Sequence, residues 1–141
     1  MKELTYQEII DQYGGFIYYP VGTSMLPLIV EGVHSVKLEK INRPIRKYDI
    51  VLYHRDNDQY VLHRVVRVHE DFYDMKGDNQ FMIEKNIRKD QVIAIMSGLY
   101  CQEQIVPLQG FRYQISIRMN LWFRHFRRLF QKIKHLLKRK K

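Results

Sequence analysis

The sequence has one cysteine, Cys101, and no apolar run long enough to cross a lipid bilayer. A single thiol excludes an internal disulfide and a metal cluster built on cysteines, and it fits a reducing compartment. Residues 1–15 are polar and acidic rather than basic and then apolar, which is not the pattern of a secretory signal. We therefore expect a cytoplasmic protein.

Acidic residues are missing from the last part of the chain. Residues 111–141 contain 11 Lys or Arg and no Asp or Glu, whereas residues 1–110 contain the other 13 basic residues and all 15 acidic ones. The first part is thus almost neutral, at −2, and the last part carries the charge of this 141-residue chain. We expect a β domain over 1–110 and a basic helical tail over 111–141, whose charge favours an anionic partner.

Short β-prone runs dominate the first part. A capping-box pattern at Thr5 and Glu8 precedes helical spacing that stops at Gly14. Strands are then predicted over 16–19, 33–38, 50–54, 60–68, 72–75 and 92–96. Short strands with frequent turns predict a mainly β protein, folded as a compact barrel or sandwich between a short N-terminal helix and the basic C-terminal helix.

The tail shows the spacing of an amphipathic helix. Its apolar positions recur at helical intervals and are Trp122, Phe126, Leu129, Phe130, Ile133, Leu136 and Leu137. Three partners remain open for residues 112–141: an anionic membrane surface, the protein's own β domain, and nucleic acid. The aromatic residues favour the membrane first and packing second, and they disfavour nucleic acid.

Three side chains in the β domain have the chemistry of a hydrolytic triad. The hydroxyl of Ser24 needs a base to become a nucleophile, His63 suits that role, and the carboxylate of Asp78 could hold the imidazole. Gly22 leaves room for a substrate backbone, and the amide of Ser24 can donate to an oxyanion. Each residue also has an ordinary alternative, as a turn serine, a packed histidine and a turn aspartate.

Other cofactor chemistry has little support in the sequence. The spacing of His54, His63 and His69 matches no metal-ligand pattern, and no glycine-rich phosphate loop is present. We expect no metal and no cofactor.

Four short segments, taken together, resemble the type I signal peptidase family. They are Gly22-Thr23-Ser24-Met25-Leu26-Pro27, Tyr48-Asp49-Ile50-Val51, Val61-Leu62-His63-Arg64-Val65-Val66 and Lys76-Gly77-Asp78-Asn79. They stand in the family's order between Val21 and Ile95. The family shares its core fold with the self-cleaving LexA-type repressors, so the resemblance implies a β-barrel core of that kind.

The resemblance also implies roles for particular residues. Histidine replaces the lysine base of most bacterial members, which is typical of the Ser/His branch found in the endoplasmic reticulum and archaea. Ser24 would then be the nucleophile and His63 the base. Asp78 would orient the base, and Glu84 is the alternative residue for that role. The main-chain amides would form the oxyanion hole, and Gly22, Thr23 and Met25 would contact substrate.

These expectations define a serine endopeptidase acting on a peptide or protein. Because the chain lacks the family's usual membrane anchor, we expect a dedicated substrate, such as the leader of a ribosomally made peptide, at the inner face of the cytoplasmic membrane. The main alternative is a non-catalytic peptide- or membrane-binding module on the same fold. A LexA-like regulator is disfavoured, because no DNA-binding domain precedes the core and histidine stands at the base position.

Overall fold

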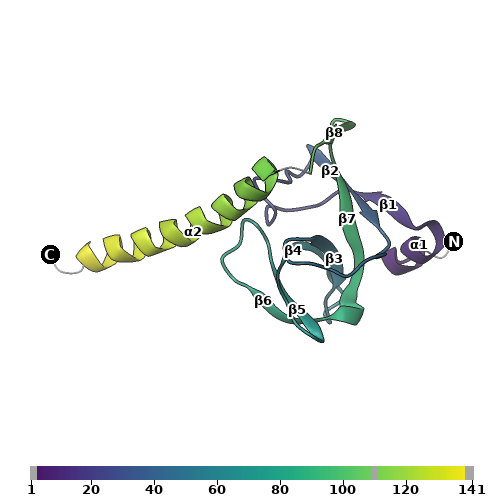
Figure 1. Cartoon of the computed structure of the whole chain (residues 1–141), viewed down its shortest axis with the longest axis horizontal. Coiled ribbons are helices and arrows are strands. Elements are labelled where there is room, and N and C mark those ends of the chain that lie inside the picture. The colour runs from purple at the N-terminus through teal and green to yellow at the C-terminus, as the bar shows by residue number, and fades with distance from the viewer. Residues whose placement is uncertain (1–2, 109–110, 139–141) are drawn as a thin grey trace. The chain divides into compact units, whose positions relative to one another are not determined.

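Eight strands pair in one antiparallel sheet, with a helix before them and a helix after them, as the computed structural model shows (Figure 1). The structure describes residues 3–108 and 111–138, and within the last helix it describes the side chains of residues 118, 122, 126 and 128–138. The elements are α1 (Tyr6–Tyr13), β1 (Gly15–Tyr18), β2 (His34–Glu39), β3 (Ile50–His54), β4 (Tyr60–Val68), β5 (Phe72–Lys76), β6 (Glu84–Arg88), a 3₁₀ turn η1 (Lys89–Gln91), β7 (Val92–Cys101), β8 (Gln104–Val106) and α2 (Phe111–Lys138).

The first helix begins and ends where local chemistry directs it. Thr5 accepts from the amide of Glu8, and the carboxylate of Glu8 accepts from the amide of Thr5 at 2.8 Å, so the predicted capping box is formed. Gly14 ends the helix in the left-handed region, at φ 76°, where a side chain would be strained. The helix packs against β1 and β7.

The sheet is open, so the expected barrel does not form. The strand order is β1-β2-β7-β3-β4-β5-β6, with β8 added beside β7, and β1 and β6 stand at opposite ends of this path. A closed barrel would require these two end strands to pair with each other. The mainly β class and the two flanking helices are as predicted, whereas the closure of the sheet is not.

Most predicted strands are present, and two were missed. The bounds of β3 and β4 match the prediction, and β5 and β7 extend it to Lys76 and Cys101. The missed strands are β6, in which only Ile87 is buried, and β8, which is three residues long. Neither has the alternation of apolar and polar residues by which a strand is recognised.

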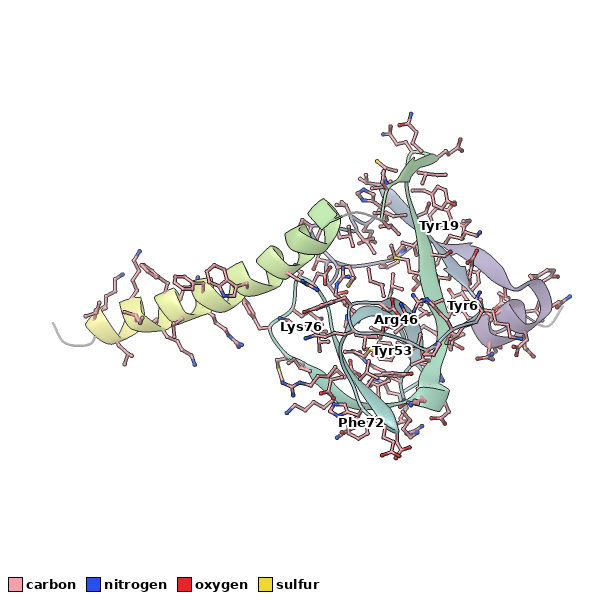
Figure 2. All side chains as sticks on the ribbon, in the orientation of Figure 1. Tyr6, Tyr19, Arg46, Tyr53, Phe72 and Lys76 are labelled. Carbon is pink, nitrogen blue, oxygen red and sulfur yellow. The ribbon has the colours of Figure 1, made fainter. Side chains whose placement is uncertain are left out.

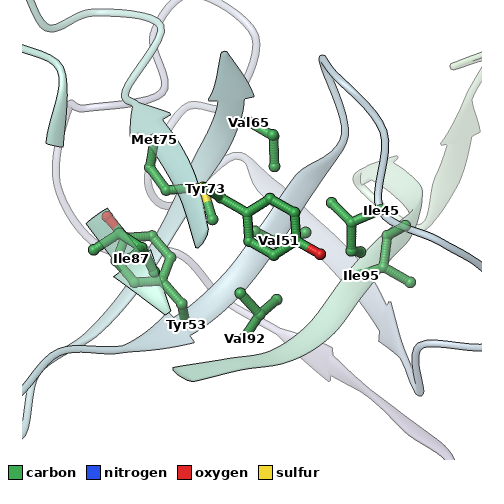
Figure 3. Close-up of a cluster of buried hydrophobic side chains, with 9 residues drawn as sticks. All are labelled: Ile45, Val51, Tyr53, Val65, Tyr73, Met75, Ile87, Val92 and Ile95. Atoms are coloured by element: carbon green, nitrogen blue, oxygen red, sulfur yellow. The ribbon is translucent and has the colours of Figure 1, made fainter. Parts of the chain in front are cut away.

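A cluster of buried side chains, on β3 to β7 and at Ile45 before β3, forms a hydrophobic core (Figure 3). Its members are Ile45, Val51, Tyr53, Val65, Tyr73, Met75, Ile87, Val92 and Ile95. Tyr53 is buried in this cluster, in the interior of the β part of the chain (Figure 2). The core thus holds the backbone of β3 and β4 rigidly at the place where they present polar side chains.

The chain separates into two units, Met1–Pro107 and Leu108–Lys141, and α2 belongs to the second. The predicted tail is helical as far as Lys138, while residues 139–141 lie outside the described residues, as do the side chains of Phe123, Arg124 and Arg127. Within the described part of the chain, no helix combines the length and the apolar character that crossing a membrane requires.

Candidate functional site

The loop that carries Ser24 lies between β1 and β2 and is anchored by buried side chains. Met25 and Ile29 are buried, and the amide of Ile29 donates to the carbonyl of Met25 at 3.0 Å. Gly22 has φ 95°, and its amide donates to the carboxylate of Glu31 at 2.9 Å. The loop therefore holds Ser24 between a constrained glycine and a buried methionine.

Ser24 and His63 line the same cleft, which has a volume of about 220 Å³. Gly22 and Met25, two of the residues expected to contact substrate, line it as well, and Thr23 is exposed beside them. The amide of Ser24, expected to serve an oxyanion, donates to no acceptor among the residues that the structure describes. The cleft thus brings together a hydroxyl, an imidazole and a main-chain donor.

The position of His63 follows from the pairing of β3 and β4. His63 lies opposite Val51, and Tyr53 lies opposite Val61, so His63 and Tyr53 are diagonal neighbours on one face of the sheet. The Tyr53 hydroxyl lies 3.1 Å from Nδ1 of His63. This hydroxyl donates in turn to Oε2 of Glu84 at 2.7 Å.

Glu84 is itself held by an arginine. Arg55 donates from Nε to Oε1 at 2.8 Å and from Nη2 to Oε2 at 2.6 Å. Burial raises the pKa of Glu84, but the hydrogen bonds from Arg55 and Tyr53 and the charge of Arg55 outweigh burial, so the pKa is lowered. Glu84 is therefore an anion at neutral pH and receives three hydrogen bonds.

Burial is also the dominant influence on the imidazole. It lowers the pKa of His63 to about 4, opposed by the negative charges of Glu84 and Asp78 and assisted by the positive charge of Arg55. The ring is accordingly neutral at pH 7. Burial and the hydrogen bond to Glu84 raise the pKa of Tyr53, which stays a phenol.

Asp78 is held by Arg64 rather than by the imidazole. Its two carboxylate oxygens accept from Nε of Arg64 at 2.8 Å and from Nη2 at 2.7 Å, and both side chains are buried. The third donor of Arg64, Nη1, binds the carbonyl of Tyr48 at 2.9 Å. Asp78 thus acts on His63 through its charge, while Arg64 links three of the four segments singled out in the sequence.

The remaining segment, which contains Ser24, is joined to the segment that contains Asp78. The amide of Asn79 donates to the carbonyl of Ser24 at 2.7 Å. A Cβ on Gly77 would lie 2.7 Å from that same carbonyl oxygen, so only glycine permits this approach. Asp49, in the segment before β3, accepts from the amide of Arg46 at 2.7 Å.

Tyr53 and Arg55 are the residues of this site that the sequence did not reveal. Tyr53 ends a continuous apolar run in β3, so its ring indicates core and its hydroxyl gives no signal of its own. Glu84, kept in reserve as the residue that orients the base, contacts Tyr53. Among the described residues, no group of three His, Cys, Asp or Glu side chains is arranged to bind a metal ion.

Comparisons of the chain with family models, with curated proteins and with solved structures gave no match. The likeness to signal peptidases therefore rests on the four segments alone.

Proposed function

We propose that the protein is a serine endopeptidase in which Ser24 is the nucleophile and His63 is the general base. The observation that carries this proposal is that both side chains line one cleft, and that the imidazole there is neutral at pH 7. A neutral imidazole can accept the proton of a serine hydroxyl, which is what a poor nucleophile requires.

The reaction would run through an acyl-enzyme. Ser24 Oγ attacks the scissile carbonyl while its proton passes to His63, and the amide of Ser24 stabilises the oxyanion. His63 then gives the proton to the leaving amine. Water, deprotonated by the same ring, hydrolyses the ester and restores the free hydroxyl.

The substrate would be an extended peptide lying in the cleft. Val21, Met25 and Ile29 line the cleft together with Ser24, and the side chain of Val21 is 81% exposed, so apolar groups adjoin the nucleophile. Exposed apolar groups of this size favour binding of an apolar segment on the substrate. A leader peptide is a substrate of this type.

The test is labelling by a serine-reactive acylating probe. Wild-type protein should be labelled at Ser24, and Ser24→Ala and His63→Gln should lose the label. Ser97→Ala, which alters an exposed serine in β7, is the matched control and should label as wild type does. Labelling that survives in His63→Gln would contradict the assignment of the base.

We further propose that α2 rests on an anionic membrane surface. All of its described apolar side chains from Trp122 onward are exposed, by 46% for Ile133 to 65% for Leu137. At 100° per residue these side chains span an arc of about 120° on one side of the helix. The positive charges at Arg128, Lys132, Lys134 and Lys138 lie outside this arc.

This arrangement suits the interface between headgroups and acyl chains. Aromatic and aliphatic groups enter the acyl boundary while lysines beside them meet anionic headgroups. Because residues 111–141 contain no Asp or Glu, no side chain of this segment repels anionic headgroups. The peptidase would then act on substrates at the inner face of the cytoplasmic membrane.

The second candidate function is a binding module that does not cleave. It is favoured by the pairing of Asp78 with Arg64, since among the residues that the structure describes no carboxylate is hydrogen-bonded directly to His63. This candidate predicts that Ser24→Ala and wild type bind an apolar peptide equally and that neither is labelled.

A further inference from the structure

We infer that Tyr53, anchored by Glu84 and Arg55, is the positioning residue that fixes the tautomer of His63. This inference rests on the proposed role of His63 as a base. It assigns to a tyrosine the task that the sequence had given to the carboxylate of Asp78.

The Tyr53 hydroxyl carries a single proton. That proton is directed to Oε2 of Glu84, a carboxylate that can only accept, at 2.7 Å. The oxygen of Tyr53 then has only lone pairs to offer to Nδ1 of His63, 3.1 Å away. The proton of the neutral ring must accordingly lie on Nδ1, which leaves the lone pair on Nε2.

A lone pair on Nε2 is what the proposed reaction needs. With Nδ1 bonded to Tyr53, Nε2 is the ring nitrogen that can take the proton from Ser24 Oγ. The opposite tautomer would carry a proton on Nε2 and could not accept another without a ring flip or a change of charge. The hydrogen bond to Tyr53 also limits rotation of the ring, which keeps Nε2 in one orientation.

Arg55 stabilises the direction of the hydrogen-bond chain that runs from His63 through Tyr53 to Glu84. Its two hydrogen bonds and its charge keep Glu84 ionised, because they lower the pKa of that carboxyl against the effect of burial. An ionised Glu84 cannot donate to Tyr53, so the Tyr53 proton cannot be turned toward Nδ1 without losing a charge-assisted hydrogen bond. The polarity of the chain, from His63 through Tyr53 to Glu84, therefore has one favoured state.

Three charged groups of the described residues act on the imidazole, and their positions agree with this assignment. Glu84 on β6, Arg55 after β3 and Asp78 after β5 act on it, and Asp78 has both oxygens engaged by Arg64. The hydroxyl of Tyr53 is the group that reaches Nδ1. A purely structural role for Tyr53 would require only its ring, which packs in the core.

Tyr53→Phe separates the two roles, because it keeps the ring and removes the hydroxyl. The control is Tyr73→Phe, a tyrosine in the same buried cluster. The first readout is the ¹⁵N NMR spectrum of His63 at pH 7, assigned by comparison with His63→Gln. Wild type and Tyr73→Phe should show the proton on Nδ1, whereas Tyr53→Phe should show a mixture of tautomers.

The second readout is the rate of labelling at Ser24. Tyr53→Phe should slow it by about tenfold or more, since a base that spends time in the wrong tautomer loses part of the 10²- to 10⁴-fold contribution of general base catalysis. Tyr73→Phe should leave the rate within about twofold of wild type. Glu84→Gln, which can still accept from Tyr53 but carries no charge, should give an intermediate tautomer ratio.

The results separate this inference from the proposed function. A proton on Nε2 in wild type, or a spectrum unchanged in Tyr53→Phe, overturns the inference even if Ser24 is labelled. If the tautomer responds to Tyr53→Phe but wild type is never labelled, the inference about Tyr53 is supported and the proposed peptidase function is rejected.

Discussion

The backbone amide of Asn79 donates to the carbonyl of Ser24, with a distance of 2.7 Å between nitrogen and oxygen. This bond ties the turn after β5 to the loop between β1 and β2. The two bonded residues are more than 50 residues apart in the chain. The bond uses only main-chain atoms of both residues, so it does not engage the hydroxyl of Ser24. The bond depends on the close approach of Gly77 to the same loop.

Gly77→Ala should therefore displace Ser24, although the substitution leaves the Ser24 hydroxyl itself unchanged. The new Cβ would lie 2.7 Å from the Ser24 carbonyl oxygen and 2.9 Å from Oε1 of Gln80. The backbone cannot yield as a side chain can, so the expected loss of unfolding free energy is about 1–3 kcal/mol, with slower labelling of Ser24. Urea denaturation and labelling kinetics measure the two effects.

Gly98→Ala is the control for that substitution. Its Cβ would meet side-chain atoms of Tyr100 and Lys37 at 3.3 Å and beyond, which can move aside. It should label like wild type. If Gly77→Ala also labelled like wild type, the contact between the two segments would have no part in placing Ser24.

The labelling rate should stay high at mildly acidic pH. A base must be unprotonated, so the rate falls as pH drops through its pKa, and burial places that of His63 at about 4. At pH 5.5 an imidazole with the ordinary pKa of 6.5 would be about 90% protonated, whereas His63 would be almost wholly neutral. A rate profile between pH 3.5 and 8 distinguishes the two cases, and a midpoint near 6.5 would contradict the burial of the ring in the working protein.

Asp78→Asn should destabilise the fold strongly. The side chains of Arg64 and Asp78 are 2% and 7% exposed, and the substitution removes the negative charge that faces the guanidinium. Breaking a buried pair in this way lowers the unfolding free energy by about 3–5 kcal/mol. Urea denaturation at pH 7 gives the value.

Asp56→Asn provides the comparison on the surface. Asp56 pairs with Arg88 at 3.2 Å, and the two side chains are 78% and 55% exposed. Such a pair contributes at most about 1 kcal/mol. Equal losses for Asp78→Asn and Asp56→Asn would mean that the Arg64–Asp78 pair is not a buried anchor in solution.

Charge reversal on α2 should weaken binding to anionic vesicles. Each basic residue near such a surface contributes about 1 kcal/mol, so Lys132→Glu with Lys134→Glu should reduce partitioning by about 30-fold or more at low salt. Co-sedimentation with vesicles of 30% phosphatidylserine measures it, beside vesicles of phosphatidylcholine alone. The matched control is Lys47→Glu with Lys85→Glu, which makes the same change of net charge at exposed positions of the β unit. Equal binding of the two double variants would mean that α2 is not the contact.

Elements with strong local signals could be predicted from the sequence. The capping box at Thr5 and the glycine at position 14 set both ends of α1, and short β-prone runs set the bounds of β3 and β4. Closure of the sheet could not be predicted, because strand number does not determine whether the two end strands pair. β6 was missed because it buries little and contains Asn86 at φ 61°.

The candidate site was predictable only in part, for a physical reason. Ser24 and His63 carry reactive groups whose chemistry is visible in the residue type alone. Tyr53 belongs to a run in which Ile50, Val51 and Leu52 are apolar, so nothing local separates a core ring from a ring with a bonded hydroxyl. Only the register of β3 against β4 places that hydroxyl beside Nδ1 of His63.

Strand β7 bridges two halves of the sheet whose strands do not otherwise pair, with β2 on one side and β3 on the other. The loop of Ser24 emerges from the half that contains β1 and β2, whereas His63 belongs to the half that contains β3 and β4. During synthesis, both halves leave the ribosome before the strand that unites them, since β7 begins at Val92. We therefore expect the site to assemble late in folding, since a nascent or truncated chain without β7 lacks the strand that pairs with both halves.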